Sequence, residues 1–384
     1  MKINILFVIP SLEISGAEKV CCQICDNLDY DKFNVSLISL SNNVPLLDTL
    51  KNKDKINFYS CNEPEKLGFP WFSFKSFIKF NKIIRKIKPN IVHSHLWGIH
   101  CIYLLAFLFL KNKPKFLATI HSSGYIYTSN KISSRSFKFI ENTIYKIFKF
   151  NLIAISNAVE DTIKKNLYYN TLTKIENGID VSLFSPDKRI KYSIFKNNNY
   201  NNNFPILIHV GKAAENKRQI DIIKAISLIK NDFPNLKLLL VGRNNKEAFA
   251  EITNELGIED NVDFIEPTNE VIKYLSIADI GIFPSIYEGL SLALAEMMSC
   301  GLPLVISDIP SFTEMTNHGE AALIVPIKNP VEIANKIRYL LENPGVAQSI
   351  KKRARELAMK KYSIDNMIKK HIDLYESIYN CKCK

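Results

Sequence analysis

The stretch that decides the fold is GIFPSIYEGLSLALAEMMSCGLPLV, residues 281–305. Residues 280–284 form a short apolar run typical of a buried strand, and residues 285–289 form a polar loop. Residues 290–299 have the length and composition of a helix, which Gly301 and Pro303 end. A buried strand that leads through a short loop into a helix is the repeating unit of a parallel α/β sheet.

Two glutamates, Glu288 and Glu296, lie on either side of the start of this helix. At a rise of about 1.5 Å per residue, Glu296 lies roughly two turns below the helix start, and its side chain leans back towards it. The backbone N–H groups of Gly289, Leu290 and Ser291 lie between the carboxylates and can bind a phosphate or diphosphate. Carboxylates accept hydrogen bonds from sugar hydroxyls, so the pattern outlines a site for a nucleotide-sugar.

The plainer interpretation is an ordinary acidic residue at a helix N-terminus and a solvated Glu296. The helix argues against it, because nearly every one of its faces is apolar, through Leu290, Leu292, Ala293, Leu294, Met297 and Met298. We therefore expect Glu296 to be mostly buried. A buried carboxylate is costly without a partner, which predicts a ligand or a hydrogen-bonding neighbour.

The composition is that of an enzyme without a membrane span. A chain of 384 residues, 47% of them apolar, is long enough for two domains. The most apolar run, residues 101–110, is shorter than the ~18 residues of a transmembrane helix. The first ten residues lack a cleavage site, and eight cysteines in such a chain are typical of reduced thiols. We expect a cytoplasmic protein.

Strand-like runs alternate with helical patterns along the whole chain, which predicts parallel sheets with helices on both faces. The first series has expected strands at 3–10, 33–40, 90–94, 116–121 and 152–156, and helices at 17–28, 73–87, 99–111 and 133–150. The second series has expected strands at 206–210, 237–241, 262–265, 280–283, 304–306 and 322–325, and helices at 331–342 and 346–360. A polar, Asn/Lys-rich segment separates the two series.

The stretch at 281–305 resembles the E-x7-E signature of retaining glycosyltransferases with the GT-B fold, particularly family 4 (glycosyl transferases group 1). Other segments resemble the same family in the expected order: IPSLEISGAEKV (9–20), KPNIVHSHLWGIH (88–100), ATIHSSG (118–124), IAISNAVEDTI (153–163), IENGIDVSLFSP (175–186) and HVGKAAENKRQIDIIKAI (209–226). The resemblance implies two Rossmann-like domains whose parallel sheets face a central cleft. We expect an N-terminal domain at 1–184, a linker at 185–204, a nucleotide-sugar-binding domain at 205–362, and a C-terminal helix in 363–384 that returns to the first domain.

The resemblance also assigns roles to residues of the second domain. Lys212 and Lys217 would contact the donor diphosphate; the family usually has an arginine at the first position, and lysine lacks its bidentate fork. Glu296 would bind the ribose hydroxyls and Glu288 the donor sugar, while the N–H groups of Gly289, Leu290 and Ser291 would meet the phosphates. Arg243, Phe264 and Ile265 lie at strand ends where the base should bind.

In the first domain the resemblance singles out Gly16 and His121. Gly16 would let a phosphate approach the backbone closely; the family usually has two glycines there, and Ser15 replaces the first. His121 would hydrogen-bond the donor sugar or orient the leaving group, although a lone histidine at a strand end is more often structural. We expect His93 and His95, at another strand end, to lie on opposite faces, with at most one near the cleft and no metal site.

The predicted activity is that of a retaining hexosyltransferase that uses a nucleoside diphosphate sugar, with Lys217, Glu288 and His121 in catalytic roles. A UDP-sugar is favoured, although these residues do not distinguish uracil from guanine or adenine. No Asp-x-Asp motif follows a strand, so we expect neither a metal nor another cofactor. The alternatives are a GT-B nucleotide-sugar epimerase, or a sugar-binding homologue that Ser15 and Lys212 have weakened.

The uneven distribution of charged residues along the chain bears on the kind of acceptor. Residues 1–180 hold 24 Lys and Arg against 14 Asp and Glu, whereas the remainder holds 26 against 24. The basic, aromatic segment 133–150 is either a membrane-surface helix or an ordinary helix with a solvated basic face. We expect a peripheral protein at the inner face of a bacterial membrane that extends a lipid-linked or oligosaccharide acceptor for capsule, lipopolysaccharide or another polysaccharide. No nucleic-acid motif accompanies the charge.

Overall fold

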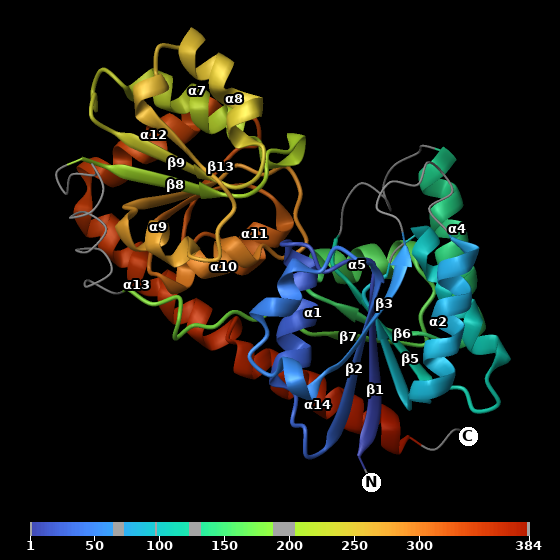
Figure 1. The fold of residues 1–384 in the computed structure, drawn as a ribbon. Helices are drawn as coiled ribbons and strands as arrows, with labels where there is room; N and C mark the ends of the chain where they lie inside the picture. Colours follow the sequence, from blue (N-terminus) through green and yellow to red (C-terminus); the bar gives the residue numbers. More distant parts are fainter. Residues whose placement is uncertain (1, 64–72, 97, 123–131, 187–203, 382–384) are drawn as a thin grey trace. The chain divides into compact units, whose positions relative to one another are not determined.

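The computed structural model describes residues 2–63, 73–96, 98–122, 132–186 and 204–381 (Figure 1). The chain divides into two compact units. Unit 1 comprises Met1–Gly178 and Ile364–Lys384, and unit 2 comprises Ile179–Ser363. Most of the predicted linker, residues 187–203, lies outside the described residues.

Unit 1 is built on a seven-stranded parallel sheet with the order β3-β2-β1-β4-β5-β6-β7. Its strands are β1 (Ile3–Ile9), β2 (Phe33–Ser41), β3 (Asn57–Glu63), β4 (Ile91–Ser94), β5 (Lys115–Ile120), β6 (Asn151–Ala154) and β7 (Thr171–Lys174). The central strands are apolar runs that are buried on both faces, as expected when helices cover both sides of a sheet.

The helices of unit 1 are α1 (Gly16–Asn27), α2 (Phe74–Ile87), α4 (Ile132–Phe148), α5 (Asn157–Asn166) and α14 (Ile364–Asn380). Three 3₁₀ segments are η1 (Pro45–Thr49), η2 (Lys53–Lys55) and η3 (Gly98–Phe109). Serine side chains cap two helices: Ser73 Oγ accepts from Ser76 N, and Ser156 Oγ accepts from Val159 N, both at 3.3 Å. In space α14 packs beside α1, whereas α2 and α4 both pack against η3 (Figure 1).

Unit 2 has a six-stranded parallel sheet with the order β10-β9-β8-β11-β12-β13. Its strands are β8 (Ile206–Val210), β9 (Lys237–Val241), β10 (Val262–Ile265), β11 (Ile280–Phe283), β12 (Leu304–Ser307) and β13 (Leu323–Val325). The helices are α7 (Gln219–Ile229), α8 (Asn245–Glu255), α9 (Val271–Ile277), α10 (Leu292–Ser299), α11 (Pro310–Met315), α12 (Pro330–Glu342) and α13 (Pro344–Lys361), with 3₁₀ turns η4 (Glu215–Lys217) and η5 (Glu259–Asn261). A core of aliphatic side chains joins α7 and α12 to the sheet.

The predicted fold class, two parallel α/β sheets of Rossmann type, is confirmed. Residues 99–111 were expected to form an α-helix, but the structure has the 3₁₀ segment Gly98–Phe109 there. Two strands were not predicted, β3 and β7, and both are the outermost strands of their sheet. An edge strand has one unpaired side and needs fewer apolar residues, which explains sequences as polar as NFYSCNE and TLTK.

The strand order reverses once in each sheet, between β1 and β4 in unit 1 and between β8 and β11 in unit 2. At each reversal, the connections that follow the two neighbouring strands run to opposite faces of the sheet. Ligands of doubly wound α/β proteins bind at this point. The loops after β1, β4, β8 and β11 are therefore the places to look for a site.

Candidate functional site

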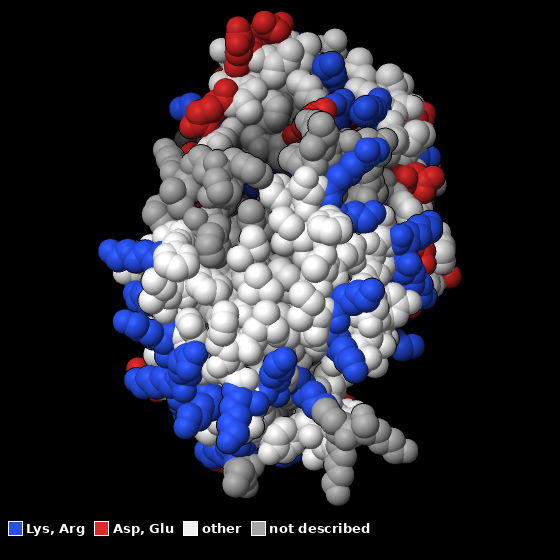
Figure 2. Space-filling view, turned by 90° about the vertical axis from the view of Figure 1, so that its right-hand side faces the viewer, with Lys and Arg blue, Asp and Glu red and all other residues white. Residues whose placement is uncertain are grey.

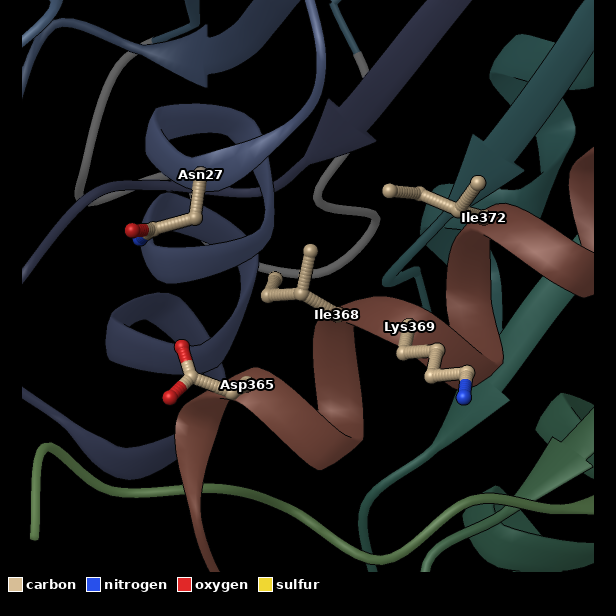
Figure 3. Close-up of a pocket in the computed structure, with 5 residues that line it drawn as sticks. All are labelled: Asn27, Asp365, Ile368, Lys369 and Ile372. Carbon is tan, nitrogen blue, oxygen red and sulfur yellow. The ribbon is translucent and has the colours of Figure 1, made fainter.

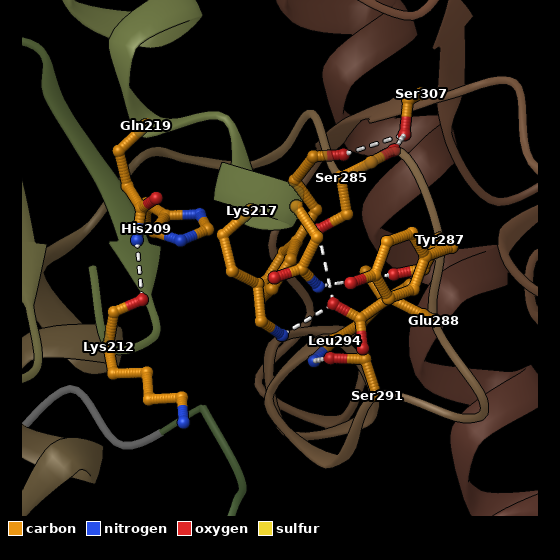
Figure 4. Close-up of polar contacts among 12 residues, drawn as sticks. His209, Lys212, Lys217, Gln219, Ser285, Tyr287, Glu288, Ser291, Leu294 and Ser307 are labelled. Carbon is orange, nitrogen blue, oxygen red and sulfur yellow. Dashed lines mark hydrogen bonds and ion pairs between the residues drawn. The ribbon is translucent and has the colours of Figure 1, made fainter. Parts of the chain in front are cut away.

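In unit 2 an ion pair joins the loops that follow β8 and β11 (Figure 4). Lys217, at the end of η4, places Nζ 2.5 Å from Oε1 of Glu288. Only 19% of the lysine side chain and 13% of the glutamate side chain are exposed, so water screens the pair less than it would at the surface. The sequence-predicted residues Lys217 and Glu288 are thus brought together at the reversal of the strand order.

Several hydrogen bonds fix Glu288 and its loop. Ser285 Oγ donates to Glu288 Oε1 at 3.2 Å, and Ser307 Oγ donates to the carbonyl of Ser285. The two loops are also joined directly, because Ile286 N donates to the carbonyl of Asn216 at 2.9 Å. Two strands, β11 and β12, and the β8 loop therefore hold the carboxylate in place.

Helix α10 begins beside this ion pair. Ser291 is its N-cap and accepts a hydrogen bond from Leu294 N at 3.3 Å. Within the part of the chain that the structure describes, no hydrogen bond is found from the backbone N–H groups of Gly289, Leu290 or Ser291, although these residues are buried. Unpaired N–H groups at a helix start next to a lysine form an anion-binding arrangement.

Glu296 lies in α10 with 6% of its surface exposed, which confirms the expectation that it is mostly buried. Its predicted distance from the helix start was wrong. The helix begins at Leu292, two residues later than predicted, because the Ser291 side chain caps it there. Glu296 is therefore only about one turn from the start, closer to the anion-binding groups than the sequence suggested.

The loop that carries Lys212 packs against the end of β9 through a glycine. Gly242 has φ +145°, and a Cβ there would lie 2.3 Å from the carbonyl oxygen of Gly211. Ala213 N donates to the carbonyl of Arg243 at 2.9 Å, which joins the Lys212 loop to the predicted base-binding residue. Lys212 itself is exposed, and Gln219 Nε2 donates to its carbonyl oxygen at 2.9 Å.

The three residues of the predicted base site, Arg243, Phe264 and Ile265, lie at the ends of two neighbouring strands, β9 and β10. The carbonyl of Ile265, the last residue of β10, accepts from Gly242 N at 2.8 Å, and Arg243 follows directly. Arg243 is exposed and Ile265 is half-buried. The need for a glycine at position 242 was not predicted from the sequence. The sequence feature that could have predicted it is a glycine directly after the strand KLLLV.

A further buried histidine, His209, lies at the reversal in unit 2 and was not predicted. Its Nδ1 is 2.8 Å from the carbonyl oxygen of Ile282, to which it donates, so the side chain links β8 to β11. Burial and, to a smaller extent, the nearby Lys217 lower the pKa of His209 to about 4, although the hydrogen bond to Ile282 raises it. The imidazole is therefore neutral at physiological pH. The sequence feature that could have predicted this residue is a polar side chain inside the apolar strand ILIHV.

In unit 1 the predicted residues Gly16 and His121 lie at the carboxyl edge of the sheet, after β1 and β5 respectively. Gly16 is the first residue of α1, and a Cβ at this position would meet nothing within 4 Å. Half-buried His121 has Nε2 2.8 Å from Nδ1 of His95. Burial lowers the pKa of His121 to about 4, so it is neutral at physiological pH.

The expectation that His93 and His95 lie on opposite faces is wrong. Side chains two residues apart in a strand share a face. The two ring centroids are only 4.6 Å apart, and both side chains are buried. The predicted site residues thus form two groups, one at the carboxyl edge of each sheet.

Among the residues that the structure describes, neither a metal-binding cluster nor a membrane-spanning helix is found. No group of three or more His, Cys, Asp or Glu side chains there could hold a metal ion. Among the helices of the same residues, none has the length and apolar character needed to cross a membrane.

Unit 1 also has a surface pocket of about 310 Å³ between α1 and α14, lined by Asn27, Asp365, Ile368, Lys369 and Ile372 (Figure 3). Asn27 ends α1, whereas the predicted site residue Gly16 begins it. Because a helix between parallel strands runs opposite to them, the pocket lies at the amino edge of the sheet. It is not part of the predicted site.

Two doubly wound sheets, each with polar side chains at its carboxyl edge, define a Rossmann-type protein. Residues 14–183 match the family model described as Glycosyltransferase Family 4, and residues 191–357 match Glycosyl transferases group 1. The chain belongs to this family of glycosyltransferases, which confirms the family predicted from the sequence motifs.

Three similar proteins illustrate the match. The UDP-Gal:alpha-D-GlcNAc-diphosphoundecaprenol alpha-1,3-galactosyltransferase of Escherichia coli is 23% identical, over 97% of each chain. The structure of a glycosyltransferase from Rickettsia africae superposes with a TM-score of 0.81 at 22% identity, covering 99% of this chain and 100% of the other. Anabaena HepE in complex with UDP superposes with a TM-score of 0.80 at 18% identity, covering 98% of this chain and 100% of HepE. These structures show that the fold is GT-B.

Proposed function

We propose that this protein transfers a sugar from a UDP-sugar, with retention of anomeric configuration, to a hydroxyl group of a lipid-linked saccharide. The observation that carries the proposal is the Lys217–Glu288 pair beside the unbonded N–H groups of Gly289, Leu290 and Ser291. The similar Escherichia coli enzyme uses UDP-Gal and a diphosphoundecaprenol-linked sugar, as its name states, and HepE was solved with UDP. Both similarities support a UDP-sugar as the donor. The similarity to the Escherichia coli enzyme also supports a lipid-linked saccharide as the acceptor.

The chemistry follows from the charges. Breaking the bond between the sugar and the diphosphate leaves negative charge on the diphosphate. Lys217, the exposed Lys212 and the three N–H groups would neutralise this charge as it develops, which is electrostatic catalysis. A diphosphate beside Lys217 would compete with Glu288 for Nζ, so that the carboxylate becomes available to the sugar hydroxyls. Glu296, about one turn into α10, would accept hydrogen bonds from the ribose.

We assign the work of a metal ion to these cationic and N–H groups, and His121 contributes a neutral hydrogen-bonding group. The base would lie at the ends of β9 and β10, against Arg243 and Ile265. Gly16 would allow the donor phosphates to approach the start of α1, because the space in front of its backbone is open.

The epimerase alternative and the weakened homologue are less favoured. Ser15 and Lys212 depart from the family pattern, but Lys217, Glu288 and the capped start of α10 are intact. The relatives named above are transferases.

The deciding experiment incubates the protein with a panel of nucleotide-sugars and follows nucleotide release with and without bacterial lipid extract. Release that depends on the extract supports the transferase. An altered nucleotide-sugar formed without any acceptor would favour the epimerase, and binding without turnover would favour the weakened homologue.

We further infer that unit 1 touches an anionic membrane, where a lipid-linked acceptor would be. Large apolar side chains are exposed on three neighbouring elements: Phe74 of α2 (70%), Phe109 of η3 (63%) and Phe139 of α4 (73%). The side of the molecule where α2 and α4 lie has a broad uncharged area bordered by lysine and arginine side chains (Figure 2). Apolar groups framed by cations favour an anionic lipid surface.

The charges of this face differ from those expected. Helix α2 carries Lys75, Lys79, Lys82, Arg85 and Lys86 and no acidic residue, whereas the sequence had directed attention to α4. In α4, Lys138 donates to Asn166 Oδ1 at 2.7 Å and is therefore turned towards the protein. We assign the main electrostatic contact to α2, and we propose a cytoplasmic protein that binds the inner membrane face peripherally.

A further inference from the structure

A row of imidazole rings lies at the carboxyl end of the unit 1 sheet. His93 and His95 come from the end of β4, His121 follows β5, and His371 belongs to α14. Ring centroids are 4.6 Å apart for His93 and His95, 5.0 Å for His95 and His121, and 5.8 Å for His93 and His371. The proposed function uses only His121, so the role of the others is open.

His93 has a partner for each ring nitrogen. Its Nδ1 lies 2.7 Å from the hydroxyl of Tyr375, and its Nε2 lies 2.7 Å from Oγ1 of Thr119. A hydroxyl can donate or accept, so both nitrogens are satisfied whichever carries the proton. His93 therefore anchors the row to α14 and β5 and needs no further ligand.

His95 is constrained differently. Its Nδ1 lies 2.8 Å from Nε2 of His121, and its own Nε2 is buried with no hydrogen-bond partner in the described ranges. Burial keeps the pKa of His95 well below its usual value, so the ring carries one proton only. If that proton were on Nε2, a buried N–H group would have no acceptor, which is rarer in proteins than an unpaired acceptor. The proton therefore belongs on Nδ1.

We propose that His95 is a positioning residue that fixes the tautomer of His121: Nδ1–H of His95 donates to Nε2 of His121, and His121 in turn presents Nδ1–H at the carboxyl end of β5. No hydrogen bond to Nδ1 of His121 is found among the described residues. His121 then acts as a hydrogen-bond donor to an oxygen atom and not as a proton acceptor at that nitrogen. The identity of the oxygen, on the donor sugar, rests on the proposed function.

Nitrogen-15 NMR of the ligand-free protein tests the tautomer directly, because protonated and bare ring nitrogens have different shifts. In the parent protein, His121 should carry its proton on Nδ1. In His95→Leu, which removes the donor, it should shift towards the Nε2–H form that free histidine prefers. His95→Asn places an amide N–H near the position of Nδ1 and should restore the parent tautomer.

The matched control is His371→Leu, which removes a buried imidazole of the same row without touching His121. It should leave the tautomer of His121 unchanged, whereas loosening of the whole row would alter both variants alike. A parent protein with Nε2–H at His121, or a His95→Leu variant with an unchanged tautomer, would overturn the proposal. The first of these results needs no variant, so poor folding of His95→Leu leaves the proposal testable.

Kinetics connect the tautomer to the reaction. His95→Leu should lower kcat/KM for the donor by roughly tenfold, the size expected for one misdirected hydrogen bond, and His95→Asn should recover most of it. Equal kcat/KM in the Leu and Asn variants would contradict the positioning role. If no nucleotide-sugar is turned over by the parent, the proposed function fails, while the NMR result still decides whether His95 orients His121.

Discussion

Acidification should destabilise unit 1, because the buried histidines His93, His95 and His371 stay neutral in the folded chain. Burial lowers the pKa of His93 and His95 well below the usual value and that of His371 to about 4. In the unfolded chain each titrates near pH 6.5. Above that pH neither state binds a proton. Below that pH, the unfolded chain binds protons at these histidines and the folded chain does not, so the free energy of unfolding falls.

The size of the effect follows from the pKa difference. At pH 5.5, one unit below the unfolded pKa, each histidine favours the unfolded state by about 1.4 kcal/mol. Three of them lower the free energy of unfolding by about 4 kcal/mol relative to pH 7.5. This is a large part of the roughly 5–15 kcal/mol that stabilises a typical domain. Carboxylates contribute little in this window, because most of them ionise below it.

Urea unfolding at pH 7.5 and 5.5 measures the difference. Far-UV circular dichroism follows the loss of helix and strand during the titration. His371→Leu should reduce the difference between the two pH values by about 1.4 kcal/mol. His318→Asn, at an exposed position of unit 2, should leave it unchanged. Equal stability of the parent at both pH values, or an undiminished difference in His371→Leu, would refute the reasoning.

Four other outcomes are expected. Lys217→Ala and Glu296→Ala should each weaken binding of the nucleoside diphosphate, the former by roughly 1.5–3 kcal/mol; unchanged affinities in calorimetric titration of both folded variants would remove the donor site. Turnover should survive EDTA, and activity lost and then restored by Mg²⁺ or Mn²⁺ would sink the metal-free mechanism. Gly242→Ala should lower the melting temperature of unit 2, since its Cβ would lie 2.3 Å from the Gly211 carbonyl oxygen; an unchanged melting temperature would contradict this reading of the loop. Replacing three α2 lysines by Gln (Lys75, Lys79 and Lys82) should reduce sedimentation with anionic vesicles, by about 1 kcal/mol per lysine at low salt. The same change at three exposed lysines of α13 (Lys352, Lys360 and Lys361) should not, and equal losses would mean that the face of α2 is merely solvated.

The strands of unit 2 could be predicted from the sequence nearly to the residue. Their apolar runs are short, buried on both faces and ended by glycine or proline, as at 206–210 and 280–283. The pairing of Lys217 with Glu288 was implicit in the order of the motifs, because the loops after two neighbouring parallel strands meet at one edge.

Contacts between distant parts of the chain could not be predicted in this way. The hydrogen bond between His93 and Tyr375 joins residues 282 positions apart, and the local sequence around either residue does not predict the contact. The start of α10 was misplaced because Ser291 is both a helix former of moderate strength and a good cap, and the backbone decides between these uses. The sequence left open whether the segment 133–150 is a membrane-surface helix, and it could not show that Lys138 turns towards Asn166, 28 residues away.

Helix α14 imposes an order on the synthesis of this protein. The chain leaves unit 1 after Gly178 and returns only at Ile364, and the two crossing points are neighbours, since Ile179 N donates to the carbonyl of Tyr362 at 2.8 Å. Unit 2 is thus an uninterrupted insertion that can be complete while the ribosome still holds the end of the chain. The core of unit 1 cannot be complete then, because the buried Tyr375 that pairs with His93 is made only after unit 2. The half that is translated first is therefore the half that matures last, and a nascent chain stalled before residue 364 would expose the side of α1 that α14 covers to chaperones.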